Sequence, residues 1–256
     1  MQKKNIPEYN SSLKKNIIRV PKIIREKTSG INIFGKTIHS ILFSTDVAII
    51  KNSNADAIIA VYPFTPHPAI TQSILLISDV PVLCGVGGGL TNGLRSANIA
   101  LHAEFQGALA VVLNAPASAE TIALVKKTID IPVIYSLVSE NFNGIQEKID
   151  AGIDILNISG GENTPKIVNL AHKKYSHMPI IATGGKTEES IAETIKAGAN
   201  AISYTPPPNA ELLRKFMAEY RDMYQWKTNI LDIFFWLLYK FVLIENYLGV
   251  EYFEHD

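Results

Sequence analysis

The feature that most constrains the fold of this chain is an alternation of two kinds of strand opening along its middle. In one kind, a proline begins a short apolar run, at Pro81, Pro132 and Pro179. In the other kind, a helix end and small residues lead into the run, as at 107–113. The prolines stand 51 and 47 residues apart, with one run of the other kind between each pair, so the repeating unit is strand, helix, strand, helix.

The number of these units predicts a closed barrel. With the run that begins at Ile41, the chain contains eight short apolar runs separated by amphipathic segments of helix length. Eight strand-helix units in 256 residues match the count and length of an α/β fold, the (β/α)8 or TIM barrel. Runs that are apolar throughout indicate parallel strands covered on both faces. An open doubly wound sheet uses the same units and is the alternative, but the count favours the barrel.

Both ends of the chain lie outside this pattern. Residues 14–27 mix basic and aliphatic side chains and predict an amphipathic N-terminal helix that closes the bottom of the barrel, or alternatively contacts a phosphate or lipid head group. Residues 230–244 are apolar all round apart from Asp232 and Lys240, and are too short to cross a bilayer. We therefore expect a barrel domain over 1–225 and a C-terminal helical appendage over 226–256. The appendage would pack on the barrel or on a partner subunit, giving a homo-oligomer, with membrane contact as the less favoured alternative.

The overall composition excludes several classes of partner. The chain has 24 basic and 24 acidic residues and a formal net charge of +0, so no overall field attracts nucleic acid. Its one cysteine, Cys84, lies within an apolar run and is expected to be a buried core residue. No secretory signal is visible at the amino terminus, which makes the cytoplasm the expected location.

Reactive groups of such barrels stand on the loops that follow the strands, and two titratable residues there are candidates for proton transfer. Asp46 ends the first strand run, and His67 follows the second. An imidazole titrates near neutrality, and a carboxylate at the mouth can serve as a base. Asp46 is alternatively a helix cap and His67, among prolines, a packing residue. No metal-binding motif is apparent, so no metal is predicted.

The seventh strand run leads into the most distinctive loop, Gly184-Gly185-Lys186. Two glycines let the backbone approach a ligand closely, and the helix start after them would suit a phosphate, with Lys186 adding a charge. Phosphate sites of this fold commonly follow strands seven and eight. Alternatively, the two glycines only let strand and helix pack together.

A second glycine cluster occupies 85–93. Its spacing matches neither the dinucleotide pattern G-x-G-x-x-G nor a P-loop, so it predicts either a loop that closes over a ligand or a tight turn. No cofactor is predicted from it. The residues expected to contact substrate from this and the other mouth loops are Tyr62, Gly87, Gly88, Asn114, Asn157 and Tyr204.

The stretch 179–203, with its Gly184-Gly185 turn, resembles the closing quarter of the phosphate-binding barrels. These include thiamine phosphate synthase, the tryptophan and histidine biosynthetic barrels, and FMN-dependent barrels. The resemblance implies a phosphate held at Gly184 and Gly185. The Gly-Ser or Gly-Thr that normally follows strand eight in these families is replaced by Ser203-Tyr204-Thr205, which removes half of the usual phosphate cradle. Segments 61–70 and 84–92 resemble a group of bacterial barrel proteins without an assigned reaction.

These observations predict an enzyme that acts on a small phosphorylated metabolite by proton transfer, as an isomerase or lyase. An FMN-binding oxidoreductase that uses the same phosphate corner is one alternative. The other is a non-catalytic barrel that serves as an assembly or membrane-associated module. In that case side chains such as Tyr62, Phe64 and Tyr204 would fill the mouth.

Overall fold

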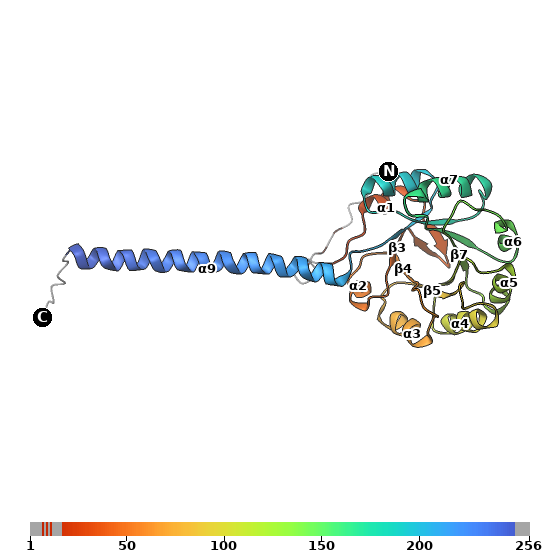
Figure 1. The fold of residues 1–256 in the computed structure, drawn as a ribbon, viewed down its shortest axis with the longest axis horizontal. Helices are drawn as coiled ribbons and strands as arrows, with labels where there is room; N and C mark the ends of the chain where they lie inside the picture. Colours follow the sequence, from red (N-terminus) through yellow and green to blue (C-terminus); the bar gives the residue numbers. More distant parts are fainter. Residues whose placement is uncertain (1–6, 8, 10, 12–16, 249–256) are drawn as a thin grey trace. The chain divides into compact units, whose positions relative to one another are not determined.

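The structure is a computed structural model that describes residues 7, 9, 11 and 17–248. Within it, eight parallel strands close into a barrel surrounded by helices (Figure 1). The ring closes where Ile202 of the last strand pairs with Ser40 of the first, which confirms the predicted barrel and rules out the open sheet. In chain order the barrel strands are β3 Ser40–Phe43, β4 Ala57–Ala60, β5 Val82–Gly87, β6 Ala110–Asn114, β7 Val133–Leu137, β8 Ile155–Ile158, β9 Ile180–Thr183 and β10 Ala201–Tyr204.

A helix follows each of the first seven barrel strands and covers the outside of the ring. Polar residues that begin these helices cap free backbone N–H groups, as Ser118 does by accepting from the N–H of Thr121 at 3.3 Å. The same helix then buries Ile122 and Val125 against the barrel. The helices are α2 Val47–Lys51, α3 Pro68–Ile77, α4 Gly93–Phe105, α5 Ala119–Thr128, α6 Ile145–Asp150, α7 Thr164–Lys174, preceded by the 3-10 turn η2 Gly161–Asn163, and α8 Glu188–Lys196.

A β-hairpin closes the N-terminal end of the barrel. Strands β1 Ile31–Ile33 and β2 Lys36–Ile38 pair antiparallel around a turn at Phe34 and Gly35, both with positive φ. The hairpin's isoleucines are buried in one cluster with inward-facing barrel residues such as Ile41 and Leu83. They occupy the bottom of the core, so the hairpin supplies the closure that we expected from a helix.

The amphipathic helix expected over 14–27 is much shorter in the structure. Residues 14–16 lie outside the described residues, 17–20 are not helical, and Ile18 forms a parallel bridge with Ser53. Helix α1 spans Lys22–Lys27 and starts after Pro21, consistent with the bias of a pre-proline residue against helical geometry.

Asp56 ties several N-terminal elements to the barrel. Its carboxylate accepts hydrogen bonds from the backbone N–H of His39 and from the N–H and hydroxyl of Ser40, and it forms an ion pair with Arg25 of α1. Burial alone would raise the pKa of Asp56, but the hydrogen bonds from Ser40, Arg25 and His39 outweigh it and lower the pKa. This part of the fold therefore depends on an ionised carboxylate.

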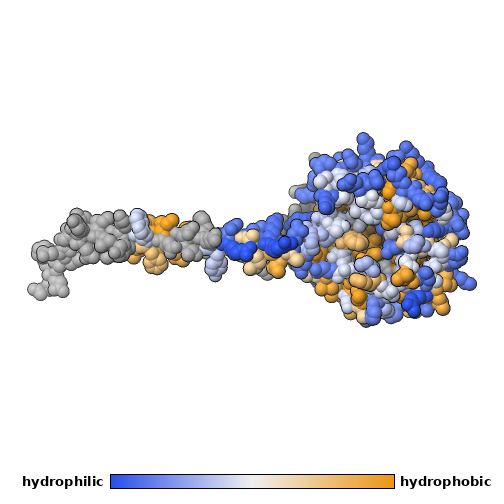
Figure 2. Space-filling model, in the orientation of Figure 1, coloured by the Kyte–Doolittle hydropathy of each residue, from blue (hydrophilic) through white to orange (hydrophobic). Residues whose placement is uncertain are grey.

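The chain divides into two units, 1–206 and 207–256. The second consists mainly of α9, Asn209–Leu248, a helix of 40 residues that begins upstream of residue 226, where we expected the appendage to start. Among the described residues, no helix meets the length and hydropathy needed to cross a membrane. In Figure 2, hydrophilic residues gather in the first part of α9 and hydrophobic ones farther along.

Candidate functional site

A layer of polar side chains lines the inside of the barrel at its C-terminal mouth. Inward-facing residues alternate along each strand, so the residues two positions after buried Val112, Ile134 and Ile155 also face inward. These residues are Asn114, Ser136 and Asn157. Their Cα atoms are register partners across β6, β7 and β8, which makes the three a continuous row.

On β9 the register partner of Asn157 is the buried Ile181, and hydroxyl groups follow two residues farther along β9 and β10. Thr183 of β9 and Ser203 of β10 are register partners, and the Thr183 hydroxyl donates to the Ser159 hydroxyl at 3.1 Å. We call Asn114, Ser136, Asn157, Thr183 and Ser203 the polar ring. Every member is neutral, so the ring offers hydrogen bonds and no net charge.

Asn157 is the member of the ring whose bonding is incomplete. The side chain is 8% exposed, and its Nδ2 donates to the Ser136 Oγ at 3.0 Å. Its Oδ1 is buried and has no hydrogen-bond partner among the residues that the structure describes. Exchanging the amide oxygen and nitrogen would leave the same deficit at the other end of the group. Since such a group costs about 1–3 kcal/mol, an unpaired amide in a polar layer indicates a place where a ligand donates or accepts.

A cavity of about 250 Å³ opens at one side of the mouth, between the loops that follow β4, β5 and β6. Tyr62 lines it, and the Tyr62 hydroxyl accepts a hydrogen bond from the backbone N–H of His67 at 2.8 Å. The Thr91 hydroxyl donates to the Thr65 hydroxyl at 3.1 Å and joins two of the loops. The lining residues are Val61, Tyr62, Pro63, Phe64, Thr65, Pro66, Gly85, Gly87, Gly89, Leu90, Thr91, Asn114 and Ala115. Tyr62 and Phe64 therefore border a cavity here and do not fill the mouth.

The glycine cluster packs tightly against β6. Gly88 has φ +120°, and a Cβ there would lie 1.9 Å from the carbonyl oxygen of Asn114. A Cβ on Gly87 would lie 2.4 Å from both the Ser96 hydroxyl and the Thr91 carbonyl oxygen. The tight-turn alternative thus accounts for these two glycines, while the loop still forms one wall of the cavity.

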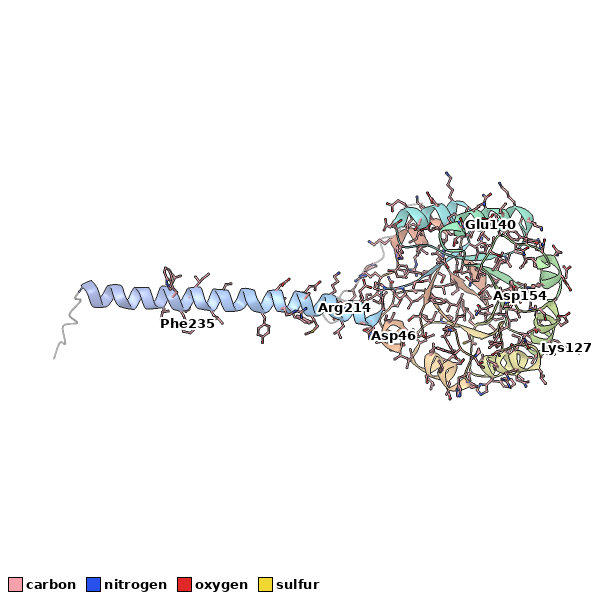
Figure 3. All side chains as sticks on the ribbon, in the orientation of Figure 1. Asp46, Lys127, Glu140, Asp154, Arg214 and Phe235 are labelled. Carbon is pink, nitrogen blue, oxygen red and sulfur yellow. The ribbon has the colours of Figure 1, made fainter. Side chains whose placement is uncertain are left out.

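Both candidates for proton transfer cap helices. The Asp46 carboxylate accepts from the N–H groups of Ala48 at 2.9 Å and Ile49 at 3.2 Å, at the start of α2 (Figure 3). The Nδ1 of His67 accepts from the N–H of Ala69 at 3.3 Å, at the start of α3. This bond requires an unprotonated Nδ1, so the neutral imidazole would carry its proton on Nε2. Neither residue lines the cavity.

The paired glycines stand on the opposite side of the ring from β5. A Cβ on Gly184 would lie 2.7 Å from Ile202 and 2.8 Å from Ile191, and one on Gly185 would lie 2.3 Å from the Ser190 hydroxyl. Close packing of the strand against the helix thus explains why both positions are glycine. Lys186 is exposed beside them.

The N-terminus of α8 already has partners within the chain. Thr187 and Ser190 form a reciprocal capping box, in which each side chain accepts from the other's backbone N–H. Hydrogen bonds from its own backbone N–H and from Thr187 lower the pKa of Glu189. An anion at this corner would therefore meet a capped helix with acidic residues in its first turn.

Two further residues, Tyr204 and Glu140, stand at or after the ends of barrel strands near the mouth. Tyr204 is half-buried, and alternation places Ser203, not Tyr204, on the inward face with Ala201. Glu140, in the loop after β7, forms an ion pair with Lys166 of α7 at 2.7 Å (Figure 3). Our predicted site residues did not include Ser136, Thr183 and Ser203 of the ring or Thr65 and Thr91 of the cavity. The alternation of side chains along a strand would have identified the ring, because its members lie two residues after a buried, inward-facing residue of the same strand.

The donors at the mouth fit a divalent cation poorly. Mg²⁺ is usually held through one or two carboxylates together with water and substrate oxygens. The ring supplies amide and hydroxyl oxygens, and the described part of the chain contains no group of three or more His, Cys, Asp or Glu that would hold a metal. We therefore assign no step to a metal.

The comparisons with known proteins establish the fold. No family model and no curated protein matches the sequence. Among solved structures, a putative phosphonomutase from Burkholderia cenocepacia J2315 is 14% identical with a TM-score of 0.58, covering 78% of this chain and 96% of its own. A 2,3-dimethylmalate lyase of the PEP mutase/isocitrate lyase superfamily is 15% identical with a TM-score of 0.57, covering 80% and 85%. A phosphonopyruvate hydrolase bound to oxalate and Mg²⁺ is 12% identical with a TM-score of 0.55, covering 75% and 83%.

These similarities correct part of the expected resemblance. A barrel of the phosphate-binding type is coarsely consistent with them. They give no support to the thiamine phosphate synthase, tryptophan and histidine biosynthetic or FMN-dependent subfamilies. The phosphonopyruvate hydrolase was solved with oxalate and Mg²⁺, and nothing in these similarities supports a flavin.

Proposed function

We propose that the protein is an enzyme of the lyase or isomerase type that acts on a small carboxylate or phosphate metabolite at the C-terminal mouth of the barrel. The observation that carries this proposal is the buried, incompletely bonded amide of Asn157 within the polar ring. The ring meets the cavity at Asn114, which belongs to both. Similar folds support the substrate class, since phosphonopyruvate, oxalate and dimethylmalate are all small anions.

In this proposal, neutral donors bind the anion. The amides of Asn114 and Asn157 and the hydroxyl of Ser136 would donate to its oxygens, because aligned N–H and O–H groups stabilise an anionic oxygen without a full positive charge. Lys186 would add a charge from the opposite side if the ligand spans the mouth. The phosphate site at Gly184 and Gly185 remains part of the proposal for phosphorylated ligands.

Tyr62 is the proton-transfer group best placed for a ligand in the cavity. It lines the cavity, and its hydroxyl accepts the N–H of His67, which leaves the phenolic proton free to be donated. Asp46 and His67 remain candidates, but each would have to give up its hydrogen bonds to a helix start in order to take a proton.

The first test is binding of oxalate and inorganic phosphate, measured by calorimetry with and without Mg²⁺. We expect Asn157→Ala to weaken oxalate binding about 10- to 100-fold, the effect of losing one hydrogen bond to a charged group. Asn143→Ala, at an exposed loop position, is the matched control and should leave binding unchanged. Binding that survives Asn157→Ala but disappears in Lys186→Ala would move the site to the paired glycines.

The second test is turnover. Exchange of solvent deuterium into a panel of small oxo and hydroxy acids, followed by NMR, detects proton transfer even while the natural substrate is unidentified. Tyr62→Phe should reduce exchange at least about 100-fold, within the usual contribution of a general acid or base. Undiminished exchange in Tyr62→Phe together with loss in Asp46→Asn or His67→Gln would assign the step to a capping residue.

A further inference from the structure

Helix α9 carries a long apolar stripe that follows a heptad repeat. From residue 213 onward, apolar residues recur at alternating spacings of four and three, which places them at the d and a positions of a coiled-coil heptad. Six of them are between 45% and 60% exposed: Leu213, Met217, Tyr220, Leu231, Phe234 and Leu238. In the first half of α9 the exposed apolar side chains therefore form one stripe, and in the second half Ile233, Phe235 and Trp236 add exposed apolar side chains beside it.

The stripe is wider than the seam of a two-stranded coiled coil. The g positions, at 216, 223, 230 and 237, are also apolar, so three of every seven residues face the same side. In the first half of α9 the other face is charged, with Lys215, Glu219 and Asp222 exposed. A stripe of this width beside a polar face is typical of helices that pack into a bundle with other helices.

We propose that α9 is a self-association helix whose stripe packs against the same stripe of a second copy of this chain. The area is sufficient, because roughly ten side chains exposing on the order of 80 Å² each give about 800 Å² per helix, the share that one partner contributes to a stable interface. The repeat is self-complementary, so a second copy supplies the matching surface without another protein.

The sequence of α9 favours a second copy over a lipid surface as the occupant. Lys227 lies within the stripe itself, where a helix bound to a lipid surface would have to bury its charge among acyl chains at a cost. The heptad positions of Asp232 and Lys240 are b and c, outside the stripe, where a bundle leaves residues in water. Lys227 falls at a d position, and a single polar residue in a seam fixes register at some cost in stability.

The experiment compares two neighbouring substitutions in the full chain. Leu231→Glu lies in the stripe at an a position, whereas Ile233→Glu lies outside it at a c position and is 58% exposed. Both introduce the same charge into an exposed aliphatic site of the same helix. Sedimentation equilibrium should give the wild type and Ile233→Glu a mass of at least twice 28.2 kDa, and Leu231→Glu a dissociation constant at least about 100-fold larger.

Leu213→Glu, near the start of the stripe, is the second variant and should weaken association in the same way. Circular dichroism of each variant establishes that the fold is retained. A monomeric wild type at micromolar concentration, or equal losses in Leu231→Glu and Ile233→Glu, would overturn the proposal. A monomeric wild type that sediments with vesicles of phosphatidylcholine and phosphatidylglycerol would overturn it in favour of a membrane surface.

Discussion

Replacing Asn157 by leucine together with Ser136 by alanine should make the protein more stable and unable to bind its ligand. The double substitution removes a buried amide whose Oδ1 has no partner among the described residues, a deficit of about 1–3 kcal/mol, and loses the hydrogen bond between the two residues, worth about 1 kcal/mol. Ser136 is changed as well because its buried hydroxyl would otherwise be left unpaired. The leucine side chain has a similar size and adds apolar contact inside the barrel. The net result is a gain of about 1–2 kcal/mol in the free energy of unfolding.

Urea denaturation measures this gain directly, provided that the slope of the transition is unchanged. A gain of 1–2 kcal/mol should appear as a rise of about 2–8 °C in the melting temperature for a domain of this size. The ligand-binding assay is then run on the same sample. Stability and binding should change in opposite directions, as they do when a polar group is kept for function.

The control is a second asparagine at the other end of the barrel. Asn200 is fully bonded, since its Oδ1 accepts from the N–H of Ile180 at 2.9 Å and its Nδ2 donates to the Ser29 hydroxyl at 2.9 Å. Asn200→Leu should lower the free energy of unfolding by about 1–3 kcal/mol, because it leaves a backbone N–H unpaired. If the double variant, Asn157→Leu with Ser136→Ala, also destabilised the protein by more than about 1 kcal/mol, Asn157 would be a structural residue and the reasoning would fail.

Three further outcomes follow from the structure. Gly88→Ala should cost about 2–4 kcal/mol in urea denaturation, because of its positive φ and the clash with the Asn114 backbone, whereas Gly89→Ala, with nothing within 4 Å, should be nearly neutral. Burial raises the pKa of the Cys84 thiol to about 12. Ellman's reagent at pH 8 should therefore react on the order of 1,000-fold more slowly with the native protein than with the urea-unfolded chain. Equal rates would show that the Cys84 thiol is exposed to solvent in the native protein. The lowered pKa of Asp56 stabilises the fold above the ordinary aspartate pKa of about 4, and this contribution disappears as the pH falls through the lower folded-state pKa. The urea midpoint of Asp56→Asn should accordingly be lower than that of the wild type at pH 7, and the two should converge toward pH 2; a constant difference would contradict the role of ionisation.

The barrel was predictable because its signal repeats. Proline or small residues begin each strand run. Because the signal recurs, an error in the position of one strand boundary does not change the count of eight strands. The hairpin at 31–38 was missed because it occurs once and its strands are three residues each, too short for alternation to stand out, although Phe34-Gly35 was a turn signal. The helix expected over 14–27 was overestimated because composition alone does not reveal that Pro21 marks a late start.

The site was less predictable than the fold, because the type of a residue does not show which groups its side chain will contact in the folded protein. Asp46 and His67 have the chemistry of acids and bases, and the structure uses both to cap helices. Asn157 was found as a polar residue near the end of a strand run, but its bonding depends on Ser136, which is 21 residues away in sequence and accepts from its Nδ2. Loops that are distant in sequence come together only because the barrel closes, and a local sequence pattern does not show which loops will meet.

The neutrality of the polar ring leads to a last prediction, about the pH dependence of binding. Amide and hydroxyl groups do not ionise between pH 5.5 and 9, and the ring holds no charged member. If the ring binds the anion, the affinity for oxalate should change less than about threefold across this range, because oxalate is fully ionised throughout. If a side chain that titrates near neutrality held the anion instead, the affinity would fall steeply as the pH rises from 6 to 8. Calorimetry at five pH values separates these cases, and a steep fall that is abolished by His67→Gln would place the ligand at the start of α3 and refute the ring as its binding site.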